Sequence, residues 1–306
     1  FFMVLNVSAQ TFDKAKLDSF FSLLEKNNKG MGSISIFKEG KEVYTKSIGY
    51  ADVEHGLKAD SETVYRIGSI SKTFTATMVM QLVESGKLAL EDKLSKFYPD
   101  VPNAEKITIE HLLRHRSGIF NFTNAEDYEK WMLDPFSREQ LLEKVKSYES
   151  AFEPNAKASY SNSNYVLLSM ILEKIEGKSF KALLKSKIAN PKRLTKTYQG
   201  GKINYKGNEA LSYTKLENWD KMPETDMSIP LGAGAIVSTP TDLNTFFTAL
   251  LTNKIIQEKQ LEVMKKIVDG YGAGLFQFPF GDKSAFGHTG GIDGFQSMAS
   301  YFPKEK

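Results

Sequence analysis

A serine followed three residues later by a lysine, Ser69 and Lys72, stands at the start of a long apolar run. In a helix the two side chains share one face near the positively polarised amino end, so the amine could activate the hydroxyl as a nucleophile. The same S-x-x-K spacing recurs at Ser35 and Ser212. Ser35 lies in an alternating stretch that predicts a strand, and no helical pattern follows Ser212. We therefore predict that Ser69 is the reactive serine.

A second candidate segment, Tyr160-Ser161-Asn162, precedes another apolar run. A tyrosine held near an ammonium has its phenolate favoured, which would bring its pKa of about 10 closer to the working range. The neighbouring carboxamide of Asn162 could hold a lysine or a substrate amide. Tyrosine and asparagine are also ordinary residues at helix starts, so this segment alone does not establish a site.

The third candidate segment runs from Gly287 through His288 and Thr289 to Gly290 and Gly291. Paired glycines in a strand allow a ligand or another backbone to come close, as in substrate docking along a strand edge. A histidine with an ordinary pKa of about 6.5 could donate to a developing oxyanion or to a substrate carboxylate. The alternative is a turn that contains an unremarkable histidine.

Composition excludes several classes of function. The 306 residues carry a formal net charge of +3, too small to indicate a nucleic-acid partner. There are no cysteines, which excludes disulfides and thiolate sites. His111 and His115 are spaced i, i+4, but no third ligand recurs nearby, so we expect no metal and no cofactor. The expected partner is a small-molecule or peptide substrate, and the oligomeric state is left open.

The first ten residues resemble the end of the apolar region of a signal peptide followed by small residues. A frayed N-terminal strand is the alternative interpretation. No later run approaches the roughly 20 apolar residues of a membrane span. These patterns predict a periplasmic or secreted protein without a transmembrane segment.

The periodicities predict an α/β (α+β) fold, with an antiparallel sheet flanked by helices and interrupted by an inserted all-helical lobe. We assign residues 1–65 and 233–306 to the sheet lobe and residues 66–232 to the helical lobe, with the active-site cleft between them. The predicted helices are 11–27, the run after Ser69 up to Gly86, 107–115, 165–175, 179–188, 243–251 and 261–268. The predicted strands are 33–37, 42–49, the stretch from 232 to the cap at Thr239, 271–280 and 284–301.

The three segments occur in the order S-x-x-K, Y-x-N, H-T-G, and this order resembles the serine β-lactamase and penicillin-binding-protein superfamily. It is most similar to the branch that contains class C β-lactamases, D-Ala-D-Ala carboxypeptidases, D-aminopeptidases and esterases. Three longer stretches carry the same likeness: ITIEHLLRHRSG (107–118), YSNSNYVLL (160–168) and GHTGGIDGF (287–295). The resemblance implies a β-lactamase/transpeptidase-like fold.

The resemblance also implies roles for the site residues. Ser69 would be the acylated nucleophile, Lys72 and Tyr160 would share the roles of general base and acid, and Asn162 would hold Lys72 and the substrate amide. The oxyanion hole would be formed by the backbone N–H groups of Ser69 and Gly291. The substrate would bind along His288, Thr289 and Gly290. Which of Lys72 and Tyr160 takes the proton stays open, because coupled groups titrate as a unit.

Two features depart from the family pattern. Class C β-lactamases usually carry Lys-Thr-Gly where this chain has His288-Thr289-Gly290, which puts efficient β-lactam hydrolysis in doubt. The family continues with a further strand and a helix beyond Lys306, so we expect either a truncated sequence or an uncovered sheet edge. The predicted function is a serine hydrolase that forms an acyl-enzyme with a peptide, amide or ester. The alternatives are a β-lactamase, or a sensor that is acylated without rapid turnover.

Overall fold

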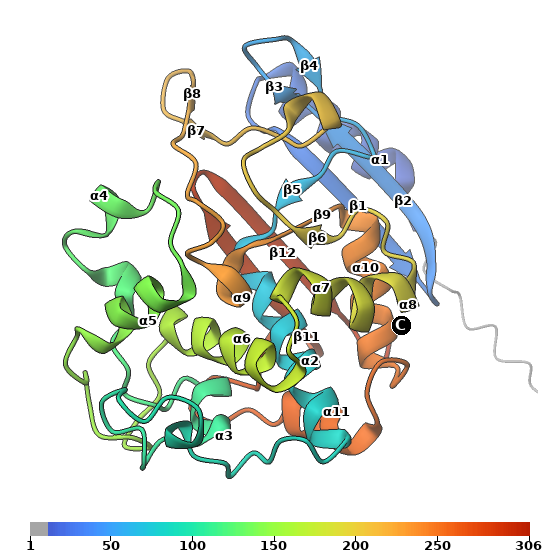
Figure 1. Ribbon diagram of the computed structural model, residues 1–306. Coiled ribbons are helices and arrows are strands. Elements are labelled where there is room, and N and C mark those ends of the chain that lie inside the picture. Colours follow the sequence, from blue (N-terminus) through green and yellow to red (C-terminus); the bar gives the residue numbers. More distant parts are fainter. Residues whose placement is uncertain (1–11) are drawn as a thin grey trace, which may run out of the picture.

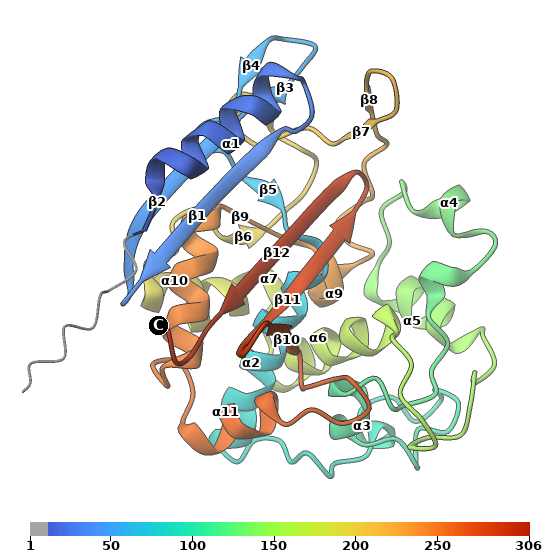
Figure 2. The same cartoon turned by 180° about the vertical axis from the view of Figure 1, so that it is seen from behind.

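The computed structural model describes residues 12–306, so the interpretation of residues 1–10 lies outside the described residues. The first described helix, α1 (Lys14–Lys26), begins at Asp13, whose side chain accepts a hydrogen bond from the N–H of Lys16. It is followed by the antiparallel hairpin of β1 (Gly32–Lys38) and β2 (Lys41–Ile48). Helix α1 packs against β2 and covers one face of the hairpin (Figure 2). This opening order of helix, strand and strand confirms the prediction.

The last three strands form an antiparallel sheet in the order β10-β11-β12, with bounds Phe276–Phe280, Lys283–Ile292 and Phe295–Tyr301. The prediction of a single strand over 284–301 is wrong, because the chain reverses at Asp293 and Gly294. Asp293 adopts a positive φ of 53°, as two-residue hairpin loops often require. The predicted strand over 271–280 begins only at Phe276.

Strand β11 has two different edges over its length. Strand β10 pairs with it only as far as Gly287, whereas β12 pairs with it up to Ile292. From His288 onward β11 packs closely against the backbone around Ile67 and Gly68, where a Cβ on Gly290 would meet the carbonyl oxygen of Ile67. This placement brings the predicted substrate strand against the segment that carries Ser69.

The core of the molecule surrounds α2 (Ser71–Glu84), in which every residue from Ser71 to Met80 is buried. A helix that is buried on all sides is typical of the centre of a large domain. Helix α2 contacts α6 (Asn162–Glu176) and α9 (Leu231–Gly234), and β11 crosses it on the other side (Figures 1 and 2). The ring of Phe74 stacks on Phe246 of α10, with 3.7 Å between the centroids.

Helix α10 (Pro240–Leu251) contacts both β1 and β12, so the two ends of the chain share one covering helix (Figure 1). Its cap is Thr239, as the sequence predicts. The strand predicted from residue 232 is wrong at its beginning, since α9 occupies residues 231–234 and the strand β9 covers only Ile236–Ser238. Residues 232–235 are alternating glycines and alanines, and their small side chains show no hydrophobic periodicity that would distinguish a strand from a helix.

The remaining elements complete the helical region and three small sheets. In the first of these sheets β9 lies between β5 and β6. In the other two, β3 pairs with β4 and β7 pairs with β8. Their bounds are β3 (Tyr50–Asp52), β4 (Leu57–Lys58), β5 (Tyr65–Arg66), β6 (Tyr198–Gln199), β7 (Tyr213–Lys215), β8 (Trp219–Lys221), α3 (Ile109–Leu113), α4 (Tyr128–Trp131), α5 (Arg138–Lys146), α7 (Phe180–Leu184), α8 (Asn190–Lys192) and α11 (Glu258–Lys265).

The mixed helix and strand content with an antiparallel sheet confirms the predicted fold class. The division into lobes at residues 65 and 233 stays a prediction. Within residues 12–306, none of the helices has both the length and the apolar character needed to cross a membrane.

Candidate active site

Ser69 lies in a 3₁₀ turn, Gly68–Ile70, which connects strand β5 to helix α2. Gly68 adopts a φ of 50°, and a Cβ at this position would lie 2.8 Å from the backbone nitrogen of Gly291. Only glycine allows this combination of backbone angle and close approach. The serine is therefore held beside β11 at the amino end of α2.

Lys72 lies in the first turn of α2 and has no exposed surface. Its Nζ is 2.7 Å from the side-chain oxygen of Asn162, 2.7 Å from the carbonyl oxygen of Ala233 and 3.0 Å from the Oγ of Ser69. Burial lowers the pKa of Lys72 well below its ordinary value, because none of these partners is an anion. In its neutral form the amine can donate its two hydrogens to the oxygens of Asn162 and Ala233, which leaves its lone pair for the proton of the serine hydroxyl.

Tyr160 donates a hydrogen bond from its hydroxyl to the Oγ of Ser69 at 2.7 Å. Burial raises the pKa of Tyr160 above its ordinary value, so the expectation of a favoured phenolate is wrong. The expectation relied on a charged lysine beside the ring, whereas desolvation lowers the pKa of Lys72 and raises that of Tyr160, and so favours the neutral form of each group. The Oγ of Ser69 lies within hydrogen-bond distance of both groups, which favours the lysine as proton acceptor and the tyrosine as proton donor.

Asn162 opens helix α6 and links it to the loop that precedes it. Its side-chain oxygen accepts from Lys72, and its Nδ2 donates to the hydroxyl of Thr123 at 3.0 Å. Its backbone N–H donates to the side-chain oxygen of Asn121 at 2.9 Å. The two side-chain bonds fix the orientation of the carboxamide, so that its oxygen and not its NH₂ group faces the lysine.

A cavity of about 180 Å³ opens beside Ser69. One wall is the edge of β11 and another is the ring of Phe276, which lies 4.5 Å from the ring of His288. The predicted site residues Ser69, Tyr160, His288, Thr289, Gly290 and Gly291 all line this cavity, together with Phe276 and Gln296. The lining contains neither a carboxylate nor a lysine or arginine.

The expected titration of His288 near 6.5 is wrong. Its side chain is buried, and burial lowers its pKa to about 3. Its Nδ1 hydrogen-bonds to the carbonyl oxygen of Thr289, so the neutral ring carries its hydrogen there and leaves Nε2 as an acceptor. The side chain therefore cannot supply a positive charge to a substrate at ordinary pH.

The other two S-x-x-K serines lie elsewhere. Ser35 is on strand β1, where its hydroxyl hydrogen-bonds to the carboxylate of Glu42. Ser212 precedes β7 and accepts a hydrogen bond from the N–H of Gly294. Both serve local structure, which supports Ser69 as the reactive serine.

Sequence reasoning missed several contributors to the site. The carbonyl of Ala233, the ring of Phe276 and the carboxamide of Gln296 carry no recognisable motif. His115 accepts a hydrogen bond from the N–H of Ser161 and packs its ring 4.5 Å from that of Tyr160. Its buried position under the Tyr160 turn explains why the i, i+4 histidine pair occurs without a metal-ligand set.

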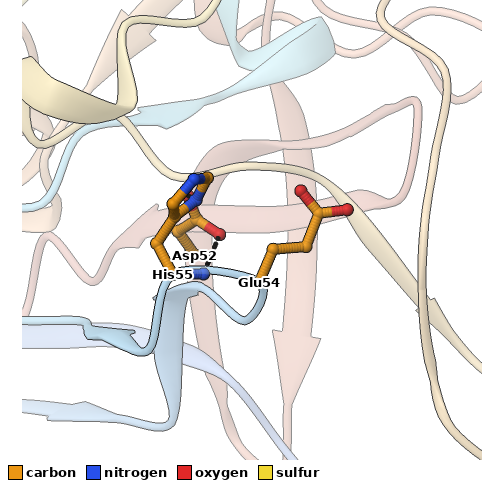
Figure 3. Close-up of side chains that lie close together, drawn as sticks. All are labelled: Asp52, Glu54 and His55. Carbon is orange, nitrogen blue, oxygen red and sulfur yellow. Dashed lines mark hydrogen bonds and ion pairs between the residues drawn. The ribbon is translucent and has the colours of Figure 1, made fainter.

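Asp52, Glu54 and His55 also lie close together at the turn between β3 and β4 (Figure 3). Asp52 is buried and accepts hydrogen bonds from the backbone N–H of His55 at 3.1 Å and from its Nδ1 at 2.6 Å. The carboxylate of Glu54 points away from Asp52 and pairs with Lys221 (Figure 3). The arrangement is that of a side-chain-stabilised turn.

Residues 22–306 match the model of the β-lactamase family. The chain belongs to this family. It is 26% identical over 255 residues to a teichoic acid D-alanine hydrolase of Staphylococcus aureus, a match covering 81% of this chain and 62% of that protein. The chain therefore spans less than two thirds of this relative.

Solved structures of the β-lactamase family share the fold across almost the whole chain. A D-amino acid amidase from Ochrobactrum anthropi SV3 superposes with a TM-score of 0.82 at 26% identity, covering 94% of this chain and 88% of the other. An octameric penicillin-binding-protein homologue from Pyrococcus abyssi superposes with a TM-score of 0.83 at 31% identity, covering 96% and 72%. These matches confirm the predicted β-lactamase/transpeptidase-like fold.

Proposed function

We propose that this protein is a serine hydrolase that cleaves esters or amides of small acyl groups through an acyl-enzyme on Ser69. The observation that carries the proposal is the hydrogen-bond chain from Tyr160 through Ser69 to the buried amine of Lys72. A nucleophile, a proton acceptor in reach and a proton donor near the leaving group are the parts that acyl transfer needs.

In this mechanism the Oγ of Ser69 attacks the substrate carbonyl carbon while its proton passes to the Nζ of Lys72. The tetrahedral oxyanion binds the backbone N–H groups of Ser69 and Gly291. The carbonyl bond re-forms as the leaving group departs, and Tyr160 supplies the proton that the leaving group needs. Lys72 returns its proton to Tyr160, and water then hydrolyses the acyl-enzyme by the same steps in reverse order.

The size and charge of the cavity support a small, D-aminoacyl-type substrate. About 180 Å³ is below the 300–1,000 Å³ of sites for drug-sized ligands, so the cavity suits one small acyl group. Two of the three proteins named above, the teichoic acid D-alanine hydrolase and the D-amino acid amidase, act on D-alanine or D-amino acid derivatives by their names, which agrees with this size. The same proposal includes carboxypeptidase action on D-amino-acid peptides. We also propose that the enzyme is secreted or periplasmic.

Efficient β-lactamase activity is disfavoured by His288. A β-lactam presents a carboxylate to this strand, and a neutral buried histidine offers it no positive charge. A sensor that is acylated without turnover keeps the same nucleophile, so turnover distinguishes it from an enzyme. A burst of product followed by a steady rate indicates hydrolysis, whereas a burst alone indicates a sensor.

Two experiments test the proposal. A parallel screen of p-nitrophenyl esters, D-aminoacyl amides, D-Ala-D-Ala peptides and nitrocefin should give steady turnover of esters or amides and poor turnover of nitrocefin. A fluorophosphonate should label the wild type, Ser35→Ala and Ser212→Ala, and fail to label Ser69→Ala. Labelling that persists in Ser69→Ala would overturn the assignment of the nucleophile.

A further inference from the structure

A buried ion pair connects the two segments that carry the proposed oxyanion donors. Arg66 stands three residues before Ser69, and Asp293 stands two residues after Gly291. The Nη1 of Arg66 is 2.8 Å from the Oδ2 of Asp293, and the two side chains are 2% and 0% exposed. The pair therefore spans from the nucleophile turn to the end of the oxyanion strand.

Both ends of this pair are held by further hydrogen bonds. The two Nη atoms of Arg66 donate to the carbonyl oxygens of Thr225 and Gly201 at 2.9 Å each, and Nη2 lies 3.4 Å from a carboxylate oxygen of Glu224. The Oδ1 of Asp293 accepts from the N–H of Thr225 at 3.0 Å and from its hydroxyl at 2.7 Å. The planar guanidinium thus has fixed partners on both of its Nη atoms, which a lysine could not reproduce.

The separation of the two segments is not set by a strand ladder. Strand β5 belongs to the sheet β5-β9-β6, and β11 belongs to the sheet β10-β11-β12. They meet through glycine backbones, with Gly68 against Gly291 and Gly290 against the carbonyl of Ile67. The hydroxyl of Ser297 on β12 also lies 2.9 Å from the carbonyl oxygen of Ile67, so a few hydrogen bonds and the ion pair, and no ladder, hold the segments in place.

We propose that Arg66 and Asp293 act as positioning residues that set the distance between the N–H groups of Ser69 and Gly291. An oxyanion hole works only when both donors reach the same oxygen at about 2.7–3.1 Å, and small displacements cost large factors in rate. Asp293 sits in a two-residue turn with a positive φ, so its bond to Arg66 also fixes where β11 ends. This inference rests on the proposed function, since an oxyanion hole matters only in acyl transfer.

The alternative is a pair that contributes to stability alone. Such a pair would change the melting temperature and the fraction of folded enzyme, but not kcat per active site. A positioning pair changes kcat more than KM, and it weakens binding of a transition-state analogue more than binding of a product. The two roles are therefore separable by kinetics on enzyme whose active sites have been titrated.

The test compares Asp293→Asn, Arg66→Lys and Thr225→Val with wild type. Thr225→Val is nearly isosteric and leaves the ion pair in place, so it stays informative if a charge variant does not fold. A matched control is Arg138→Lys, which alters the bidentate pair of Arg138 with Glu173 on α5 and α6. Each protein is titrated with a fluorophosphonate and assayed with a p-nitrophenyl ester and a boronic acid inhibitor.

We expect kcat per titrated site to fall by about 10- to 100-fold in Asp293→Asn and Arg66→Lys, with KM changed less than about threefold. Boronate affinity should fall in step with kcat, and Thr225→Val should show a smaller loss of the same kind. Arg138→Lys should keep kcat. Unchanged kcat per site with a lower melting temperature would overturn the positioning role, as would an equal loss in the control. Absence of labelling and turnover in the wild type would instead refute the proposed function.

Discussion

The substitution Asn162→Asp tests the role of Lys72 directly, because it would place a carboxylate oxygen 2.7 Å from its Nζ. In the wild type, burial among uncharged partners lowers the pKa of the amine well below its ordinary value. A carboxylate favours the ammonium form and so raises the pKa of Lys72. An ammonium has no lone pair for the serine proton, so activity should fall at pH values below the raised pKa and return as the pH rises through it.

The size of the effect follows from the distance. Two unit charges 2.7 Å apart interact with about 6 kcal/mol at an effective dielectric constant of 20, which is an upper bound because the carboxylate is itself desolvated. Neighbouring opposite charges shift a pKa by about one to three units in proteins. We therefore expect the midpoint of the acidic limb of kcat/KM to rise by about one to three pH units, with a loss that reaches roughly 10- to 1,000-fold at pH values below the wild-type midpoint.

The local structure should tolerate this change. The Nδ2 of Asn162 donates to the hydroxyl of Thr123, and that hydroxyl can rotate to donate to a carboxylate instead. Asn162→Ala is the control, since it removes the acceptor without adding charge. It should lower kcat/KM without moving the acidic limb upward.

The assay measures kcat/KM for a neutral p-nitrophenyl ester from about pH 5 to pH 10 in the wild type and both variants. Recovery of Asn162→Asp at alkaline pH would support Lys72 as the proton acceptor. An acidic limb that stays at the wild-type position in Asn162→Asp would refute this reasoning, and would point to a proton acceptor that does not sense position 162.

Three further predictions concern residues around the same cavity. Lys72→Ala and Tyr160→Phe should each lower kcat by about 10²- to 10⁴-fold, and the double variant should lose little more activity than either single variant. If the two losses in activation free energy add fully in the double variant, the two groups act independently. Burial lowers the pKa of His288 to about 3, so the pH profile of kcat/KM for a carboxylate-bearing substrate should show no step from this histidine near pH 6.5. A step near pH 6.5 that disappears in His288→Gln would contradict the neutral assignment. Gly290→Ala would overlap the backbone oxygen of Ile67, so thermal denaturation should show a loss of about 1–3 kcal/mol, whereas an unchanged melting temperature would argue against this contact.

Elements whose signals are local were predictable from the sequence. The helix caps at Thr108 and Thr239 are present where the residue types predict them, because each cap is a bond between a side chain and a backbone N–H three residues away. The β1–β2 hairpin and helix α6 follow their periodicities for the same reason. The prediction of one strand over 284–301 is wrong because apolar alternation continues on both sides of Asp293-Gly294 and hides the turn. This dipeptide is itself typical of a hairpin turn.

The sequence by itself determined which side chains could form the site. The order of the three segments around Ser69, Tyr160 and His288 indicated the family, and residues 22–306 match its model. The pattern of glycines also indicated that a backbone would approach closely, as Gly68 and Gly291 do. These conclusions needed only residue types and their spacing.

The protonation states were decided by the tertiary structure alone. A reference pKa describes a solvated group, whereas Lys72, Tyr160 and His288 are desolvated by elements that lie far from them in the sequence. The carbonyl of Ala233 reaches Lys72 from α9, and Phe276 covers His288 from β10. Desolvation depends on everything packed around a group, so no local pattern could have predicted the direction in which these three pKa values shift.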